Sequence, residues 1–268
     1  MIGYLRRNSV LIAGFGVLLY MFLPIFVVIL MSFNDPASRN SYSFDGFTMH
    51  NWLNPCEPYG MCEAVGLSIR IGVVATVGAT LLGSLMAFAF ARHRFRGRSA
   101  ANVFTFLPMA SPEIVMGSSL LALFVNVGMG GALGFWTILI AHITFCLSFV
   151  VVTVKARLAG LDPSLEQAAM DLYANEWQTF RRITLPLVFP GILSAALLSF
   201  SLSFDDFIIT NLNAGQSQTF PMFVWGAAQR GIPPQINVIG TVMFVLALTL
   251  VLMGDLNNRR RERRQSSE

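Results

Sequence analysis

The chain has 268 residues, of which 54% are hydrophobic and only 12% are charged. Soluble domains carry about 25% charged residues, so this composition excludes an ordinary soluble protein and indicates a membrane protein. The net charge of +4 comes from basic residues that are clustered between long apolar runs. Because no basic patch belongs to a soluble domain, no nucleic-acid partner is expected.

Long uncharged runs divide the chain into segments that could cross a bilayer. About 20 apolar residues in a helix span the hydrocarbon core, where a helix satisfies its own backbone hydrogen bonds. The long run 114–154 holds the end of one span and the whole of the next, with a glycine-rich turn at 128–134. The sequence therefore predicts an all-α integral membrane protein with six transmembrane helices, at 9–33, 66–91, 100–126, 133–155, 184–209 and 235–256.

The first apolar stretch follows Arg6 and Arg7, as the core of a secretory signal peptide would. It is longer than the roughly 7–15 residues of such a core, and no small-x-small cleavage site follows it. We expect a helix that is retained.

Basic residues cluster in alternate segments between the predicted spans. Cytoplasmic segments of membrane proteins are enriched in Lys and Arg, and six spans with both termini in the cytoplasm place every cluster on that side. The same clusters would be attracted to anionic lipid of the inner leaflet. They comprise Arg6 and Arg7; Arg92, Arg94, Arg96 and Arg98; Lys155, Arg157, Arg181 and Arg182; and Arg259, Arg260, Arg261, Arg263 and Arg264.

Two of the three cysteines, Cys56 and Cys62, lie in the first outer loop with Pro and Gly between them. An oxidising outer compartment would permit a disulfide there, and two free thiols are the alternative. Cys146 lies inside a predicted span, where a cysteine behaves as a small packing residue.

Small residues recur every four positions in the second predicted span. Residues of this size let helix backbones approach closely in lipid. Two interpretations stay open. The row could form an interface with another subunit or with a pore, or it could pack within one bundle. The row consists of Ala75, Ala79, Gly83, Ala87 and Ala91, beside a parallel row of Gly72, Thr76, Thr80 and Ser84.

Glu113, Asp205 and Asp206 are acidic residues inside the predicted spans. Pro108 and Pro112 should break or kink the third span directly before Glu113, which at about 1.5 Å per residue would lie near the middle of the membrane. Asp205 and Asp206 lie in the outer half of the fifth span or at the outer interface.

A charged residue inside the bilayer costs at least about 2.5–3.5 kcal/mol, so it normally faces a cavity or a partner. No Lys or Arg lies in the same helices at similar depth. We therefore expect Glu113, Asp205 and Asp206 to be unpaired and to line the pathway of a cationic solute. Coulomb attraction would be supplemented by cation–π contacts with Phe204, Phe207 or Trp225.

Two alternatives to this pathway stay open. A helix N-terminus could stabilise the carboxylate of Glu113. One of the two aspartates could simply face water at the interface, because adjacent residues point about 100° apart on a helix.

Enzyme motifs are absent from the sequence. There is no HExxH and no GxSxG, and His50, His93 and His142 are far apart in the predicted topology, so no catalytic or metal site is expected. Lys155 is the only lysine and lies outside any glycine-rich phosphate loop, so the chain has no Walker A site for ATP. An intramembrane protease using the two adjacent aspartates is disfavoured, because a catalytic dyad must converge.

The polar segment 162–182 carries helix signals on the cytoplasmic side. Asp162 is a predicted N-cap before a proline, and Asn175 with Gln178 forms a second predicted cap. Between them, apolar positions follow a helical period. The sequence predicts two short helices whose small residues favour docking into a protein cleft; a helix pair resting on lipid is the alternative.

This segment resembles the EAA loop of ABC-importer permeases, whose pattern is E-A-A-x3-G-x9-I-x-L-P. The matching residues are Gln167, Ala168, Ala169, Tyr173, Ile183, Leu185 and Pro186. The spacing is kept, but Gln167 replaces the glutamate and Tyr173 replaces the glycine. The resemblance implies a coupling helix that fits a groove on a separate ATPase subunit, with contacts from Glu166, Gln167, Ala168, Ala169, Asp171, Leu172 and Tyr173.

Further segments resemble the spermidine/putrescine permeases, at 92–97, 111–117, 135–154, 203–206 and 231–237. This resemblance implies a type I ABC-importer permease fold (MetI-like) in the bacterial cytoplasmic (inner) membrane. It also implies three segments: a first helix and outer loop at 1–64, a permease core at 65–256 with coupling helices at 162–182, and a basic cytoplasmic tail at 257–268.

The partners that the resemblance implies are a second homologous permease, two ATPase subunits that use ATP and Mg²⁺, and an extracytoplasmic substrate-binding protein. The chain itself is expected to bind no cofactor. Two alternatives remain: an importer of the same kind for iron, an oxyanion, an amino acid or another small solute, and a standalone proton-coupled carrier or channel. The second alternative would leave the segment 162–182 unexplained.

Overall fold

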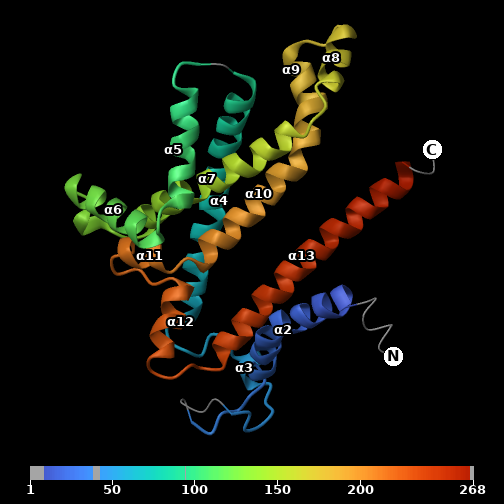
Figure 1. Cartoon of the computed structure of the whole chain (residues 1–268). Coiled ribbons are helices and arrows are strands. Elements are labelled where there is room, and N and C mark those ends of the chain that lie inside the picture. The colour runs from blue at the N-terminus through green and yellow to red at the C-terminus, as the bar shows by residue number, and fades with distance from the viewer. Residues whose placement is uncertain (1–8, 39–42, 94, 266–268) are drawn as a thin grey trace. The chain divides into compact units, whose positions relative to one another are not determined.

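The computed structural model describes residues 9–38, 43–93 and 95–265, and Figure 1 traces the chain. Within these ranges the regular elements are all helices, and an isolated antiparallel bridge joins Asn34 and Phe47. The all-α prediction is confirmed for this part of the chain. Of the basic clusters, Arg6, Arg7 and Arg94 lie outside the described residues.

The chain divides into two compact units, which are described separately. One comprises Met1–Cys62 and Val224–Glu268, and the other comprises Glu63–Phe223. The predicted boundary at residue 256 falls inside the last helix, α13 (Gln235–Gln265), and the three-part division of the sequence stays a prediction.

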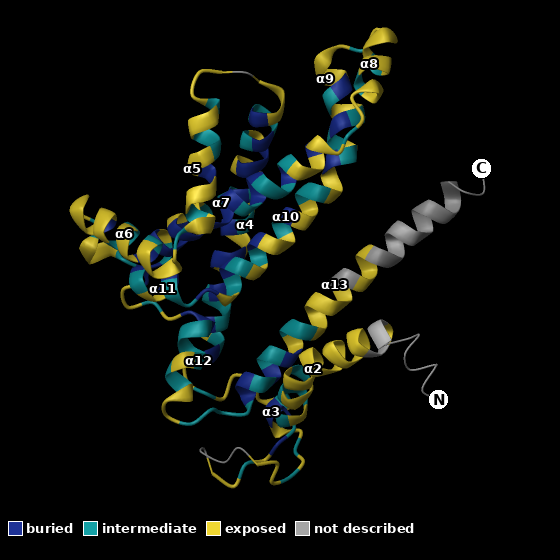
Figure 2. Cartoon of the chain, viewed as in Figure 1, coloured by how far each residue is buried: buried dark blue, intermediate teal, exposed yellow. Residues whose placement is uncertain are grey.

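In the first unit, α2 (Ser9–Met31) lies against α13, with α3 (His50–Leu53) beside the start of α13. The rings of Phe22 and Phe244 meet edge to face with their centroids 6.4 Å apart. Gly240 faces Val28 of α2, and a Cβ added there would lie at an ordinary contact distance of 3.5 Å from the Val28 side chain. Most of α2 is exposed within this chain (Figure 2), as expected of a helix that faces lipid.

The outer segment between α2 and α3 folds around a buried asparagine and an aromatic stack. The side-chain oxygen of Asn34 accepts a hydrogen bond from the backbone N–H of Asp45 at 2.8 Å. The ring of Phe33 stacks on both Phe47 and Trp52, with centroid distances of 5.5 and 5.3 Å. The described residues of this segment therefore have a small core of their own.

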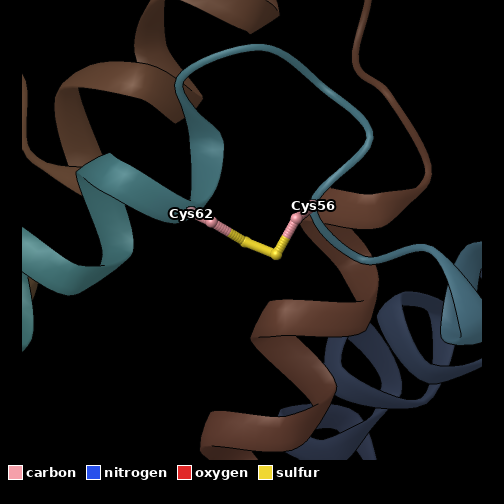
Figure 3. The surroundings of a disulfide bond; sticks show 2 residues. All are labelled: Cys56 and Cys62. Carbon is pink, nitrogen blue, oxygen red and sulfur yellow. A yellow bond between two sulfur atoms is a disulfide. The ribbon is translucent and has the colours of Figure 1, made fainter.

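The structure joins Cys56 and Cys62 in a disulfide, with their Cα atoms 5.4 Å apart (Figure 3). The free-thiol alternative is not the arrangement found. Within the closed loop, the carboxylate of Glu57 accepts a hydrogen bond from Gln235 at 3.0 Å and contacts His50 Nε2 at 2.9 Å. The disulfide loop is thereby connected to the first turn of α13 and to α3.

The core of the second unit lies between α4 (Met61–Arg92), α7 (Phe135–Ala159) and α10 (Leu185–Asp205). Figure 2 shows α7 as the most continuously buried of the three. Cys146 is completely buried there and forms no disulfide, in agreement with its predicted packing role.

The small residues of α4 pack inside this unit. Ala75, Ala79 and Ala87 are completely buried. A Cβ added to Gly83 would lie 2.7 Å from the side chain of Val150 on α7. The row therefore serves the close approach of α4 to its neighbours within one bundle, which is the second of the two interpretations left open by the sequence.

Two predicted spans are broken. The third consists of α5 (Arg98–Ala110) and α6 (Glu113–Asn126), which are bent by 109°, so the predicted break at the prolines is confirmed. The fifth was predicted to continue to residue 209, which is wrong: α10 ends at Asp205 and α11 (Ile208–Asn213) follows. A short 3₁₀ turn lies at Gly130–Ala132, and the helix α12 (Phe220–Ala228) begins in the second unit and ends in the first.

Among the described residues, five helices are long and apolar enough to cross a membrane, and the bent pair α5–α6 would make a sixth span. The five are Ala13–Met31, Met61–Arg92, Phe135–Ala159, Glu176–Asp205 and Gln235–Gly254. They correspond to the spans predicted from hydropathy, with the third accounted for by the bent pair.

Candidate functional site

Glu113 is the first residue of α6, directly after the sharp bend that follows Pro112. The backbone N–H groups of Val115 and Met116 are taken by the carbonyl of Pro112, at 2.9 and 3.1 Å. The side chain of Glu113 is exposed within this chain. Its place in the first turn of a helix also favours a negative charge, so the two interpretations from the sequence are compatible.

The structure separates the two aspartates at the end of α10. Asp205, the last residue of the helix, is exposed, whereas only 8% of the surface of Asp206 is accessible. Asp206 has an extended backbone conformation, which ends the helix. The two side chains therefore have different surroundings, and of the two only Asp205 is exposed.

Asp206 is held within the chain. One carboxylate oxygen accepts hydrogen bonds from the backbone N–H and the hydroxyl of Thr210, at 2.8 and 2.7 Å. The same oxygen lies 3.3 Å from His142 Nε2 on α7. The expectation that all three acids are unpaired is therefore wrong for Asp206. Its partner is a histidine on another helix, whereas the expectation rested on the absence of Lys and Arg from the same helices.

His142 and its neighbours were missed by sequence reasoning. Besides Asp206, its ring contacts Ser203 through Nδ1 and Thr210 through Nε2, at 2.7 and 2.9 Å. A signal was present in the sequence, because an ionisable residue inside a span marks a functional position by default. The rule holds for His142 as it does for the three carboxylates.

The three aromatic residues predicted to make cation–π contacts lie on different elements. Phe204 stacks on Phe200, with ring centroids 5.9 Å apart, and lies 6.2 Å from Phe220. Phe207 occupies the break between α10 and α11. Trp225 lies on α12 and is 58% exposed, in the part of α12 that belongs to the first unit.

The helices α6 and α11 form one packed pair. The side-chain amide of Asn213 donates to the carbonyl of Gly117 on α6 at 3.2 Å. A Cβ on Gly117 would lie 2.8 Å from the side chain of Leu212 and 3.2 Å from the Cα of Ile209. The element that begins with Glu113 therefore follows the position of α11.

The segment 162–182 forms the predicted pair of short helices, α8 (Ser164–Asp171) and α9 (Glu176–Thr179), followed by a π-helical turn at Phe180–Thr184. Asp162 accepts a hydrogen bond from the N–H of Ser164 at 2.9 Å, which lowers the pKa of its carboxyl. Asn175 and Gln178 make the reciprocal bonds of a capping box, as predicted.

Glu166 and Gln167 have different surroundings in α8. The carboxylate of Glu166 is bonded by Arg92 at the end of α4 and by the hydroxyl of Thr184, the latter at 2.6 Å. Gln167 is exposed, as are Ala168, Asp171, Leu172 and Tyr173, with Ala169 partly so. Glu166 thus ties α8 to the rest of the chain, and its exposed neighbours remain available for a partner.

Known proteins resemble this chain over most of its length. The family described as "Binding-protein-dependent transport system inner membrane component" matches residues 79–267. The chain belongs to this family. It is thus a multi-pass inner-membrane component, of the kind that serves as the permease subunit of an ABC transporter.

Three curated relatives are permease proteins. The spermidine/putrescine transport system permease protein PotC of Haemophilus influenzae is 38% identical over 258 residues, which cover 96% of this chain and 98% of the relative. The Escherichia coli protein of the same name is 38% identical, covering 96% and 95%. The putrescine transport system permease protein PotI of Escherichia coli is 35% identical, covering 88% and 85%.

Solved structures share the fold at lower identity. A chain of a bacterial alginate ABC transporter in complex with its periplasmic protein superposes with a TM-score of 0.68 at 17% identity, covering 97% of both chains. A chain of the MetNI methionine ABC transporter superposes with a TM-score of 0.60 at 16% identity, covering 76% of this chain and 97% of that one. At these identities the similarity shows the fold of ABC-importer permeases and no more.

Proposed function

We propose that this chain is one permease subunit of an ATP-driven importer for polyamines such as spermidine and putrescine. The observation that carries the proposal is the 38% identity to permeases named for these solutes, over nearly the whole of both chains. The two exposed carboxylates, Glu113 and Asp205, support it independently, because each is the chemical complement of an ammonium group. Both stand at helix breaks, where irregular backbone in a membrane protein lines cavities.

The exposed acids would attract ammonium groups without holding them tightly, with Phe204, Phe207 and Trp225 offering cation–π contacts along the path. Asp206 would not contact the solute, and it would contribute to the path by stabilising the break between α10 and α11. An anionic solute would be repelled by such a path, and a neutral one would gain nothing from it.

Energy would come from other polypeptides. In this proposal the chain binds no cofactor, and two ATPase subunits that use ATP and Mg²⁺ dock on α8 through the exposed Gln167, Ala168, Asp171, Leu172 and Tyr173. A second homologous permease completes the pathway, and an extracytoplasmic binding protein delivers the solute. Both termini of the chain would lie in the cytoplasm, on the side of the ATPase subunits.

The test is uptake by the complex in proteoliposomes, with the chain purified together with its partner subunits. ATP-dependent accumulation of labelled spermidine is expected, with Glu113→Gln and Asp205→Asn each lowering the uptake efficiency about tenfold through loss of a charged interaction. Asp35→Asn, which removes an exposed carboxylate in the outer segment, is the matched control for overall charge and should have little effect.

Competition between solutes for uptake tests whether polyamines are the transported class. Excess putrescine should reduce spermidine uptake, whereas an amino acid, iron or an oxyanion should not. Competition by one of those instead, or unchanged uptake in both acid variants, would contradict the proposed solute or the proposed path, respectively.

A further inference from the structure

The break between α10 and α11 is made without glycine or proline. The sequence from Ser203 to Thr210 reads SFDDFIIT, and hydropathy alone predicts a helix that continues through it. Asp206 ends α10 because its carboxylate serves as a cap for α11, accepting from the N–H groups of Ile209 and Thr210 at 3.4 and 2.8 Å. The break therefore depends on the chemistry of side chains.

His142 supports this cap from a different helix. Its ring is buried on α7, with 2% of the side chain accessible, and the side chain of Asp206 is 3% accessible. The ring bonds Ser203 before the break and Thr210 after it. One imidazole thus connects both sides of the break to α7.

The hydrogen-bond geometry fixes where the ring proton lies. The hydroxyl of Thr210 donates its single proton to the carboxylate of Asp206, so its oxygen can only accept from His142 Nε2. A carboxylate oxygen 3.3 Å from the same nitrogen also requires an N–H there, because two lone pairs would repel. Nε2 therefore carries a proton, and in the neutral ring Nδ1 accepts from the hydroxyl of Ser203.

The position of α11 also affects the position of Glu113, which is the first residue of α6. Because Gly117 of α6 is packed on Ile209 and bonded by Asn213, α6 moves with α11. Asp205, in contrast, belongs to α10. The position of α11 relative to α10 therefore sets the distance between the two exposed carboxylates.

We propose that His142 is a positioning residue: by holding the break between α10 and α11, it fixes the spacing of the Glu113 and Asp205 carboxylates and so the length of diamine that the permease prefers. This inference rests on the proposed function as an amine importer. In this proposal His142 does not touch the solute. It acts through the spacing of the two carboxylates, which selects solutes by the separation of their two ammonium groups.

The experiment measures uptake of a homologous series of α,ω-diamines by the reconstituted complex. Because the same binding protein serves every variant, its own preference cancels when each variant is compared with the parent. His142→Gln places an amide N–H near the position of Nε2 and should retain the parental ratio of uptake between chain lengths. His142→Asn reaches only the position of Nδ1, loses the bond to Thr210, and should change that ratio roughly threefold or more.

The matched control is Ser148→Ala. Ser148 is a buried polar residue on the same helix whose hydroxyl has no hydrogen-bond partner within the described residues, so its loss should leave the ratio unchanged. If His142→Asn lowers the uptake of every diamine by one factor, or if Gln and Asn act alike, His142 is merely structural and the proposal is wrong.

A second measurement does not depend on transport. With only this chain labelled in the complex, ¹⁵N NMR reports which ring nitrogen carries the proton. The substitutions His50→Gln and His93→Gln leave His142 as the only histidine of this chain. A proton on Nε2 is expected, and a ring protonated only at Nδ1 would overturn the proposal. If the parent complex transports no amine, the proposed function fails, while this measurement still decides whether the bonds to Asp206 and Thr210 exist.

Discussion

Tyr173 shows how the departure from the EAA pattern is accommodated. Its backbone has φ of 62°, in the left-handed region. The N–H groups of Tyr173 and Ala174 bond the carbonyls of Met170 and Ala169, at 2.9 and 3.1 Å, which is the Schellman arrangement that ends a helix. Glycine is favoured at this position, because a residue with a Cβ loses about 1–2 kcal/mol in the left-handed conformation.

Two substitutions of Tyr173 should therefore distinguish the strain of its left-handed backbone from any contact that its ring makes with an ATPase subunit. Tyr173→Gly and Tyr173→Ala both remove the ring, which is 98% exposed, but only glycine relieves the backbone. The glycine variant is expected to protect α8 against hydrogen exchange by about 1 kcal/mol more than the alanine variant. Equal exchange in the two variants would contradict a left-handed Tyr173. If the ring contacts the ATPase, both variants should weaken coupling equally.

Glu166 and Gln167 offer a second comparison at the level of single residues. Glu166→Ala leaves Arg92 and Thr184 without their carboxylate, and it should loosen α8 by about 1 kcal/mol, a modest value because the pair is partly exposed. Gln167→Ala removes an exposed amide and should not alter the exchange of α8. Hydrogen exchange of residues 164–184 in the assembled complex measures both, and faster exchange in the Gln167 variant would reverse the assignment.

At the scale of elements, α4 carries two glycines that should respond in opposite ways to the same change. A Cβ on Gly83 would lie 2.7 Å from the Cβ and Cγ1 of Val150, whereas a Cβ on Gly66 meets nothing within 4 Å. Gly83→Ala should lower the stability of the protein by about 1–3 kcal/mol, because overpacking pushes α4 away from α7. Gly66→Ala should be neutral or stabilising, since alanine is the better helix former.

Thermal unfolding of both variants in detergent tests this difference. A Gly83→Ala variant as stable as the parent would mean that α4 can shift without cost. In that case the small residues of α4 would again be candidates for an interface with another subunit.

The helix breaks divide into two kinds at this scale. Proline accounts for the bend between α5 and α6 and is visible in the sequence. The break after α10 needs His142, which lies 61 residues before Ser203. A local pattern therefore predicts the first break and misses the second.

For the whole molecule, the absence of a Walker A motif from the sequence leads to a test of whether ATP hydrolysis is carried out by separate subunits. The purified chain alone is expected to show neither ATP hydrolysis nor solute uptake, and ATP-dependent uptake should appear when the partner permease and ATPase subunits are added. Copurification identifies those subunits. Uptake by this chain alone, driven by a proton gradient, would support a standalone carrier and contradict the importer proposal.

The sequence by itself determined the membrane class, the all-α fold, the approximate spans and the EAA-like segment with its caps. These features depend on composition and on contacts between residues close in sequence, such as the capping pair of Asn175 and Gln178. They can be read without knowing how the helices pack.

Only the tertiary structure decided which carboxylates are exposed and why. Asp205 and Asp206 are chemically identical neighbours, and no local rule distinguishes them. The distinction arises because α7 places His142 against one face of the break and buries Asp206 there. Burial and hydrogen bonding across distant segments are properties of the packed helices, since the chain must be folded before these groups can meet.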